Sequence, residues 1–305
     1  MSVPLATTRY PPAAGSTPSG VLVVCSPGGG HGRDTFDVSV DGGPDDSLAG
    51  FLAARGHTVV TVDLLGVGPG SPRGDEVTMA AAGEALTAVT RGLLRGASAR
   101  GIHRVVGLGH SLGGAVTARA AADSGIFDAV ALLGYSPAWR SVPDAADRPV
   151  GEAEVRRWTF DRLRESDPRL WGDEAISFPT GDGGFAHLAD VPEAVREAAA
   201  DGAPPVPRGI AVDFGIPEPA LAAAAAIRQP VLLAFGGVDA STDPATEPDW
   251  YPASPAVTLV RLPGSAHCHH VSADRHELWN RLDDWIAATG AEPPPNLDFD
   301  DIPTE

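Results

Sequence analysis

Short apolar runs rich in β-branched residues recur along this chain, with helical patterns between several of them. The runs have the length and composition of strands buried in a parallel sheet. They cover residues 21–25, 58–64, 104–108, 128–133, 230–235 and 257–262. Patterns with apolar residues on one helical face cover residues 46–55, 77–95, 112–124 and 275–289. This alternation predicts an α/β fold, with a mostly parallel central sheet and helices on both of its faces.

Residues 137–229 interrupt the alternation of strand and helix. This interval contains helical patterns between Pro- and Gly-rich loops, and it has no run typical of a buried strand. The helical patterns lie near residues 152–165, 190–200 and 218–228. We therefore predict an α/β core formed by residues 1–136 and 230–290, with residues 137–229 as a helical cap insertion. Residues 291–305 are acidic and proline-rich, and we expect a disordered tail there.

Composition and charge narrow the possible functions. The chain has 305 residues and a formal net charge of −18, which disfavours binding to nucleic acid or to an anionic membrane. It contains no lysine, which excludes a phosphate-binding P-loop and a Schiff-base mechanism. Two cysteines do not make a disulfide framework, and no apolar run is long enough to span a membrane. Without a recognisable signal peptide, a cytoplasmic location is expected.

One serine lies between glycines, in Gly109-His110-Ser111-Leu112-Gly113, after a predicted strand and before a predicted helix. A serine nucleophile must project from a sharp strand-to-helix turn, and glycines two residues before and after it relieve the crowding there. The following helix directs the positive end of its dipole towards a developing oxyanion. In this strand–turn–helix context, the motif predicts a nucleophilic serine.

With this motif the chain resembles the α/β-hydrolase superfamily, in the branch that uses a serine nucleophile. Further segments resemble that family in the same order along the chain. They are residues 21–30 (VLVVCSPGGG), 63–71 (DLLGVGPGS), 231–239 (VLLAFGGVD) and 262–267 (LPGSAH). The resemblance covers about residues 20–136 and 229–288. One position departs from the family pattern, because Pro27 replaces the usual histidine before the oxyanion glycine. The register of this loop is therefore open by one residue.

The resemblance implies a catalytic triad of Ser111, Asp239 and His267, in the chain order of this fold. A serine hydroxyl becomes a good nucleophile when a base removes its proton, and His267 is the candidate base. Asp239 would hold the imidazole in the required tautomer. Two competitors remain open at this stage: His269 for the base, and Asp243 for the acid.

The backbone N–H groups of Leu112 and Gly29 are the candidate oxyanion donors. The neighbouring side chains and loop residues expected to contact substrate are Gly28, His31 and His110. Three nearby histidines at 267, 269 and 270 can suggest a metal site, but no second cluster with ligand spacing is evident. We therefore expect neither a metal nor a cofactor.

These residues predict a hydrolase of an ester, thioester or lactone, acting on a small to medium organic molecule. Acyl transfer, carbon–carbon bond hydrolysis and cofactor-free haloperoxidase chemistry are alternatives on the same triad. A ligand-binding scaffold of the same fold is the alternative outside enzymes. The sequence leaves the oligomeric state open. Most aromatic residues of the insertion are expected to form its own core, with one or two facing the cleft. These are Trp139, Trp158, Phe160, Trp171, Phe178 and Phe185.

Overall fold

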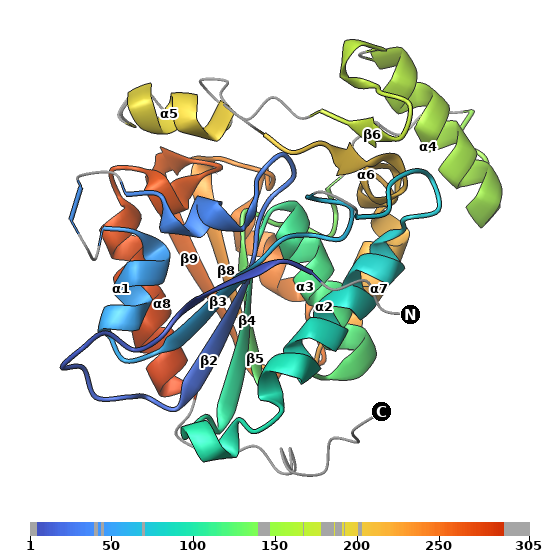
Figure 1. The fold of residues 1–305 in the computed structure, drawn as a ribbon. Helices are drawn as coiled ribbons and strands as arrows, with labels where there is room; N and C mark the ends of the chain where they lie inside the picture. Colours follow the sequence, from blue (N-terminus) through green and yellow to red (C-terminus); the bar gives the residue numbers. More distant parts are fainter. Residues whose placement is uncertain are drawn as a thin grey trace.

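A computed structural model describes most of the chain. The described residues are 5–39, 42–43, 46–68, 71–139, 147–166, 168–177, 186, 191, 193–200 and 203–289. A seven-stranded sheet crosses the centre of the molecule (Figure 1). In spatial order its strands are β1 (Thr7–Tyr10), β3 (Thr58–Val62), β2 (Val21–Ser26), β4 (Arg104–His110), β5 (Ala129–Leu133), β8 (Val231–Val238) and β9 (Val257–Ala266). Only β1 pairs antiparallel in this sheet, so the predicted mostly parallel α/β fold is confirmed.

Helices cover both faces of the sheet, on opposite sides in Figure 1. One face carries α1 (Leu48–Ala54) and α8 (Arg275–Ala288), and the other carries α2 (Met79–Leu94), α3 (Leu112–Ser124) and α7 (Pro217–Ala226). Strand β2 shows why its sequence is continuously apolar. Leu22 and Val24 pack towards α2 and α3, whereas Val21, Val23 and Cys25 pack towards α1 and α8. Successive side chains point to opposite faces, and both faces are buried here.

The segment between β5 and β8 lies mainly beyond the carboxyl edge of the sheet (Figure 1). Its elements are α4 (Glu152–Ser166), β6 (Ala175–Ile176), α5 (Glu193–Ala200), β7 (Val206–Pro207), α6 (Arg208–Phe214) and α7. Helices α4, α5 and α7 lie close to the expected positions, but α6 and the short β6–β7 pair are additions to the sequence-based description. Short 3₁₀ helices also occur, at η1 (Arg33–Asp37), η2 (Ser98–Arg100), η3 (Pro168–Leu170), η4 (Pro244–Trp250) and η5 (His269–Val271).

Helix α7 packs against α3, in the layer that covers the sheet. By its contacts, this last helix of the segment is continuous with the core. Helix α6 also packs against α2 and places Ile210 and Ala211 in the core, whereas α4 packs on α6. The division into a core of residues 1–136 and 230–290 and a cap of residues 137–229 stays a prediction. The expected tail at residues 291–305 lies outside the described residues.

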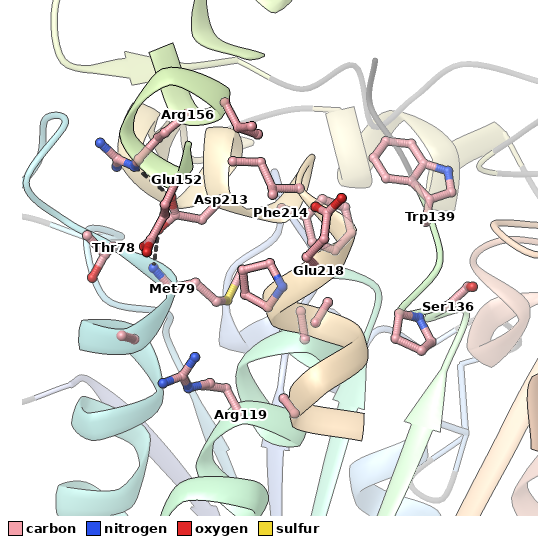
Figure 2. A pocket seen from close by; sticks show the side chains of 18 of the residues that line it. Thr78, Met79, Arg119, Ser136, Trp139, Glu152, Arg156, Asp213, Phe214 and Glu218 are labelled. Carbon is pink, nitrogen blue, oxygen red and sulfur yellow. Dashed lines mark hydrogen bonds and ion pairs between the residues drawn. The ribbon is translucent and has the colours of Figure 1, made fainter. Parts of the chain in front are cut away.

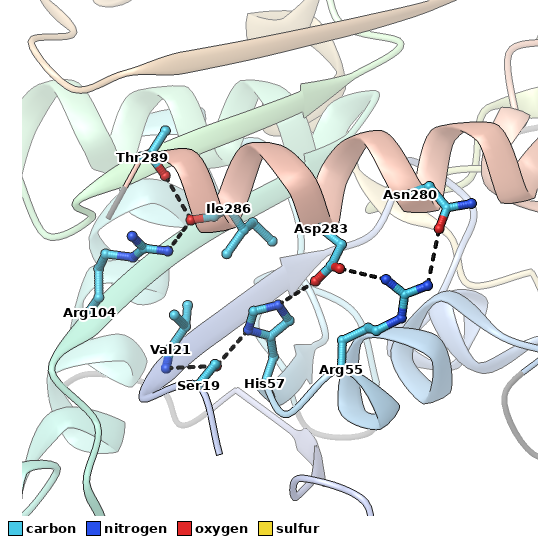
Figure 3. Close-up of polar contacts among 9 residues, drawn as sticks. All are labelled: Ser19, Val21, Arg55, His57, Arg104, Asn280, Asp283, Ile286 and Thr289. Atoms are coloured by element: carbon cyan, nitrogen blue, oxygen red, sulfur yellow. Dashed lines mark hydrogen bonds and ion pairs between the residues drawn. The ribbon is translucent and has the colours of Figure 1, made fainter. Parts of the chain in front are cut away.

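A buried histidine joins α8 to the amino end of the sheet (Figure 3). The Nε2 of His57 donates to Asp283 Oδ1 at 2.9 Å, and its Nδ1 accepts from Ser19 Oγ at 2.7 Å. Arg55 contacts the other carboxylate oxygen of Asp283 at 2.7 Å. Burial lowers the pKa of His57, although the hydrogen bond and charge of Asp283 act in the opposite direction. The imidazole is therefore held neutral, and both of its nitrogens have partners.

We expect Asp283→Ala to lower the free energy of unfolding by about 1–3 kcal/mol, because it leaves the Nε2–H of the buried His57 without its acceptor. Asp284→Ala is the matched control, since this neighbouring carboxylate on α8 is exposed. Its effect should stay within about 0.5 kcal/mol. Urea unfolding followed by circular dichroism measures both. Equal stability of the two variants would show that the His57–Asp283 contact contributes little.

Candidate active site

Ser111 occupies a strained turn between β4 and α3. Its φ is 52° and its ψ is −117°, and it is the single non-glycine residue with positive φ in the described part of the chain. The Ser111 N–H donates to the carbonyl of Leu133 at 2.8 Å, which ties the turn to the end of β5. The strand and helix predicted around the motif are both present, so the serine projects at the carboxyl edge of the sheet.

Two glycines make room for this turn. A Cβ at Gly113 would overlap the carbonyl oxygens of Ser26 and Pro27, and a Cβ at Gly109 would overlap that of Gly113. The chain leaving β2 therefore passes directly over the first turn of α3. Any side chain at these two positions would push the chain apart and move Ser111.

Asp239 and His267 meet at the carboxyl ends of β8 and β9. The distance from Asp239 Oδ1 to His267 Nδ1 is 2.6 Å, within the range expected for this pair. The backbone N–H groups of Gly236 and Ala240 also donate to the Asp239 carboxylate, each at 2.7 Å. Burial alone raises the pKa of Asp239, but the hydrogen bond from His267 and the nearby histidines outweigh it and hold the pKa below its usual value. The carboxylate is thus ionised and fixed in orientation.

Asp243 and His269, the competitors for the acid and the base, lie in different surroundings from Asp239 and His267. Asp243 caps η4, where its side chain accepts from the N–H of Ala245 at 3.3 Å. His269 is fully buried, and its Nε2 lies 3.6 Å from Asp239 Oδ2, on the carboxylate oxygen that His267 does not use. Burial lowers the pKa of His269 to about 4, with Asp239 opposing the shift. Neither competitor lines the cavity in front of Ser111.

A cavity of about 230 Å³ lies in front of the serine. Seven of the eight residues predicted for the site line it, and Asp239 lies behind His267 without reaching it. The lining residues are Gly28, Gly29, His31, His110, Ser111, Leu112, Trp139, Ala186, Ala211, Phe214, Ala240, His267 and Cys268. Among the described residues, this lining contains no Asp, Glu, Lys or Arg, so the space suits an uncharged group.

The loop after β2 brings Gly28 and Gly29 to the cavity. A Cβ at Gly28 would lie 3.4 Å from the Cβ of Ser111, so this glycine packs against the serine turn. The Nδ1 of His31 donates to the carbonyl of Gly29 at 3.2 Å, which orients that peptide. Both glycines line the cavity in front of Ser111.

The buried carboxylate of Asp63 holds this loop in place. Asp63 accepts from the backbone N–H of Arg33 at 2.8 Å and pairs with its guanidinium at 2.6 Å. Asp63 follows β3, on the segment whose sequence resembles the family's D-x-x-G-x-G-x-S loop. The resemblance pointed to this segment, but the ion pair with Arg33 has no signal in a single sequence, because the two residues are far apart along the chain.

His110 contacts the backbone of the candidate base, His267. Its Nε2 donates to the backbone carbonyl of His267 at 3.0 Å, and the two ring centroids lie 4.7 Å apart. Burial, and then the neighbouring histidines, hold the pKa of His110 well below its ordinary value. We predicted a contact with substrate for this residue, and the geometry adds a contact that orients the backbone of His267.

Two aromatic side chains, Trp139 and Phe214, form one wall of the cavity, with ring centroids 5.2 Å apart. Trp139 was among the aromatic residues considered, but Phe214 was missed, because it ends a short helix with no clear periodicity. Phe160 and Trp171 pack on each other instead, at 4.8 Å. Phe178 and Phe185 lie outside the described residues.

Metal binding and membrane insertion find no support in the geometry. Among the described residues, no group of three or more His, Cys, Asp or Glu side chains is arranged to hold a metal ion. Within the same part of the chain, no helix has the length and apolarity needed to cross a membrane.

The serine turn, the adjoining His–Asp pair and the sheet order together define an α/β hydrolase. A sequence model described as "Alpha/beta hydrolase family" matches residues 22–281. The chain belongs to this family and is a hydrolase by class. Among curated proteins, no sequence matches it significantly.

Many solved structures share the fold. A monoacylglycerol lipase from Paleococcus ferrophilus has a TM-score of 0.65 and 19% identity, covering 94% of this chain and 100% of that one. A monoglyceride lipase variant from Saccharomyces cerevisiae, solved with a substrate analogue, has a TM-score of 0.64 and 16% identity, covering 94% and 92%. A thermophilic esterase from Thermogutta terrifontis has a TM-score of 0.59 and 19% identity, covering 93% of each chain. At these identities the likeness concerns the fold.

We expect the free energy of unfolding to fall as the pH drops below about 6.5. Burial keeps the pKa of His110 and His269 below that of an unfolded histidine, so the unfolded chain takes up protons first. Each such group contributes about 1.4 kcal/mol per pH unit. Urea unfolding at pH 7.5, 6.5, 5.5 and 5.0 measures the slope.

The variant His269→Asn should reduce this slope by about one proton. His276→Asn is the control, because its ring is exposed on α8. A slope that is the same in wild type and His269→Asn would remove His269 as a source of the pH dependence.

Proposed function

We propose that this hydrolase cleaves an ester, thioester or lactone of a small to medium organic molecule through an acyl-enzyme on Ser111. One observation carries the proposal. A histidine bonded to a buried carboxylate at 2.6 Å lines the same cavity as a serine on a strained turn. Serine activation by an oriented base requires this set of groups.

In the proposed first step, Ser111 Oγ attacks the carbonyl carbon while His267 Nε2 takes the hydroxyl proton. The proton goes to Nε2 in this scheme, because Nδ1 is bonded to Asp239. His267 then gives the proton to the leaving oxygen or sulfur, and the acyl group stays on Ser111. In the second step, His267 takes a proton from water, whose oxygen attacks the acyl carbon. His267 then returns this proton to Ser111 Oγ as the bond to the acyl group breaks and the acid leaves.

The negative charge on the carbonyl oxygen would be stabilised by the N–H groups of Leu112 and Gly29. Leu112 is the first residue of α3, and the N–H groups of a first helical turn have no acceptor within the helix. The α3 dipole adds positive potential at the same point. Gly29 lines the cavity from the opposite loop, which supports its assignment as the second donor.

The uncharged lining favours a neutral acyl or alcohol group over a charged one. Esterase and lipase names among proteins of the same fold agree with ester cleavage. Acyl transfer to an acceptor other than water, carbon–carbon bond hydrolysis and haloperoxidase chemistry use the same triad and stay as alternatives. A fluorogenic short-acyl ester tests ester cleavage directly, because a ligand-binding scaffold would release no product from it.

We expect Ser111→Ala to lower kcat on such an ester by about 10⁶-fold, because no other group replaces the nucleophile. An activated phosphonate probe should label wild type and leave Ser111→Ala unlabelled. Ser124→Ala, at the other end of α3, is the control and should keep full labelling and activity. Intact-mass spectrometry gives the readout. Labelling that persists in Ser111→Ala would reject the assignment.

The acid is tested by a pair of matched variants. We expect Asp239→Asn to lower kcat by about 10⁴-fold, because an amide favours the wrong tautomer of His267. Asp243→Asn should leave kcat near that of wild type, since Asp243 caps η4. Steady-state kinetics on one ester measures both. Collapse of Asp243→Asn together with an active Asp239→Asn would transfer the role to Asp243.

A further inference from the structure

A second and larger cavity adjoins the one in front of Ser111 (Figure 2). Its volume is about 780 Å³, and it lies among α2, α3, α4, α6 and α7. The two cavities share Trp139 and Phe214 in their linings. They also open on successive turns of α3, since Leu112 lines the first and Ala115 the second. One helical turn separates these residues, a rise of about 4.5 Å.

The aromatic pair lies where the two spaces meet, and hydrogen bonds fix the backbone at or next to each of its members. The N–H of Trp139 donates to the carbonyl of Ser136 at 3.2 Å, in a turn that follows β5. Phe214 ends α6 directly after Asp213, which accepts from Arg156 at 2.8 Å and from the N–H of Met79 at 3.0 Å (Figure 2). Asp213 thus joins α6 to α2 and α4, and the wall stands between fixed elements.

The interior of the second cavity is mainly apolar. The apolar side chains include Met79, Ala115, Val155, Ile216, Pro219 and Ala223. Each arginine at its boundary is already paired with a carboxylate. The pairs are Arg119–Asp123, Arg148–Glu218 and Arg156–Asp213. A charged ligand would have to compete with these pairs, whereas an uncharged apolar group loses nothing by entering.

The volumes of the two cavities also favour a substrate arm that reaches the second cavity. The cavity at Ser111 holds about eight water-sized groups, at about 30 Å³ for each. This is below the range of about 300–1,000 Å³ that is usual for pockets enclosing a whole organic ligand, whereas the second cavity falls within that range. A substrate with its carbonyl at Ser111 and one arm longer than about eight atoms exceeds this cavity, and the adjoining apolar space begins at Trp139 and Phe214.

We propose that the second cavity binds one long apolar arm of an ester whose carbonyl lies at Ser111. The substrate class is therefore a neutral ester with an unbranched or weakly branched hydrocarbon arm of about eight to twelve carbons. This inference rests on the proposed function and adds its chain-length preference. Met79 on the cavity floor suits such an arm, because its flexible thioether adapts to different shapes.

The test uses two series of esters below their critical micelle concentrations. One series varies the acyl chain of p-nitrophenyl esters from C2 to C12, and the other varies the alcohol of acetate esters over the same lengths. We expect kcat/KM to rise with length to about C8–C10 in one series, which identifies the arm that enters the cavity. A steady fall beyond C4 in both series would overturn the proposal.

Substitutions that fill the cavity test the proposal by their effect on chain-length preference. Ala220 on α7 lines the cavity, and Ala220→Phe should lower the ratio of kcat/KM for the C10 ester to that for the C4 ester at least about tenfold. Ala80→Phe fills the cavity from α2 and should act in the same direction. Ala222→Phe is the matched control, because Ala222 is exposed on α7, and it should leave the ratio unchanged. A ratio measured within one variant is insensitive to partial misfolding.

An unchanged ratio in both Ala220→Phe and Ala80→Phe would reject the cavity as a binding site. Failure of the proposed function gives a different result, since wild type would then hydrolyse no ester at all. In that case, calorimetric titration with 1-decanol, which is uncharged, tests the cavity alone. Binding to wild type and to Ala222→Phe that is lost in Ala220→Phe supports the site, and equal binding or no binding overturns it.

Discussion

The close approach of two backbones organises the candidate site. The chain leaving β2 passes over the first turn of α3 at Gly113, at a distance that no side chain permits. This contact holds the turn that keeps Ser111 at a φ of 52°, which costs about 1–2 kcal/mol for a residue with a side chain. The same contact brings the loop of Gly28 and Gly29 against the serine. The proposed nucleophile and the proposed oxyanion donors thus depend on one crossing point.

A second constraint applies to the buried histidines beside this crossing, because burial disfavours their charged form. His110 and His269 are buried together next to the ionised Asp239, and burial favours their neutral form. A neutral His110 can donate through Nε2 to the backbone of His267 without placing a positive charge behind it. The negative charge next to His267 therefore comes from Asp239, at 2.6 Å from its Nδ1.

Local sequence was sufficient where one segment determines its own structure. The buried runs at 104–108 and 230–235 became strands because both faces of the sheet are covered, and the glycines around Ser111 announce a sharp turn. The family resemblance, rather than local pattern, pointed to Asp239, whose carboxylate lies 2.6 Å from His267. Contacts between distant segments gave no such signal. The Arg33–Asp63 pair and the Trp139–Phe214 wall each join residues whose proximity depends on the completed fold.

Helix α8 joins the carboxyl end of the sheet to its amino end. Near its start, Trp279 donates to the carbonyl of His270 at 3.1 Å, just after the turn that carries His267. Further along, Asp283 binds His57, and the carbonyl of Ile286 accepts from Arg104 at the start of β4. Opening the His267 turn therefore disturbs the same helix whose Asp283 and Ile286 hold the amino end of the sheet. We therefore expect this turn to unfold together with the core, with amide protons that exchange at rates set by global rather than local opening.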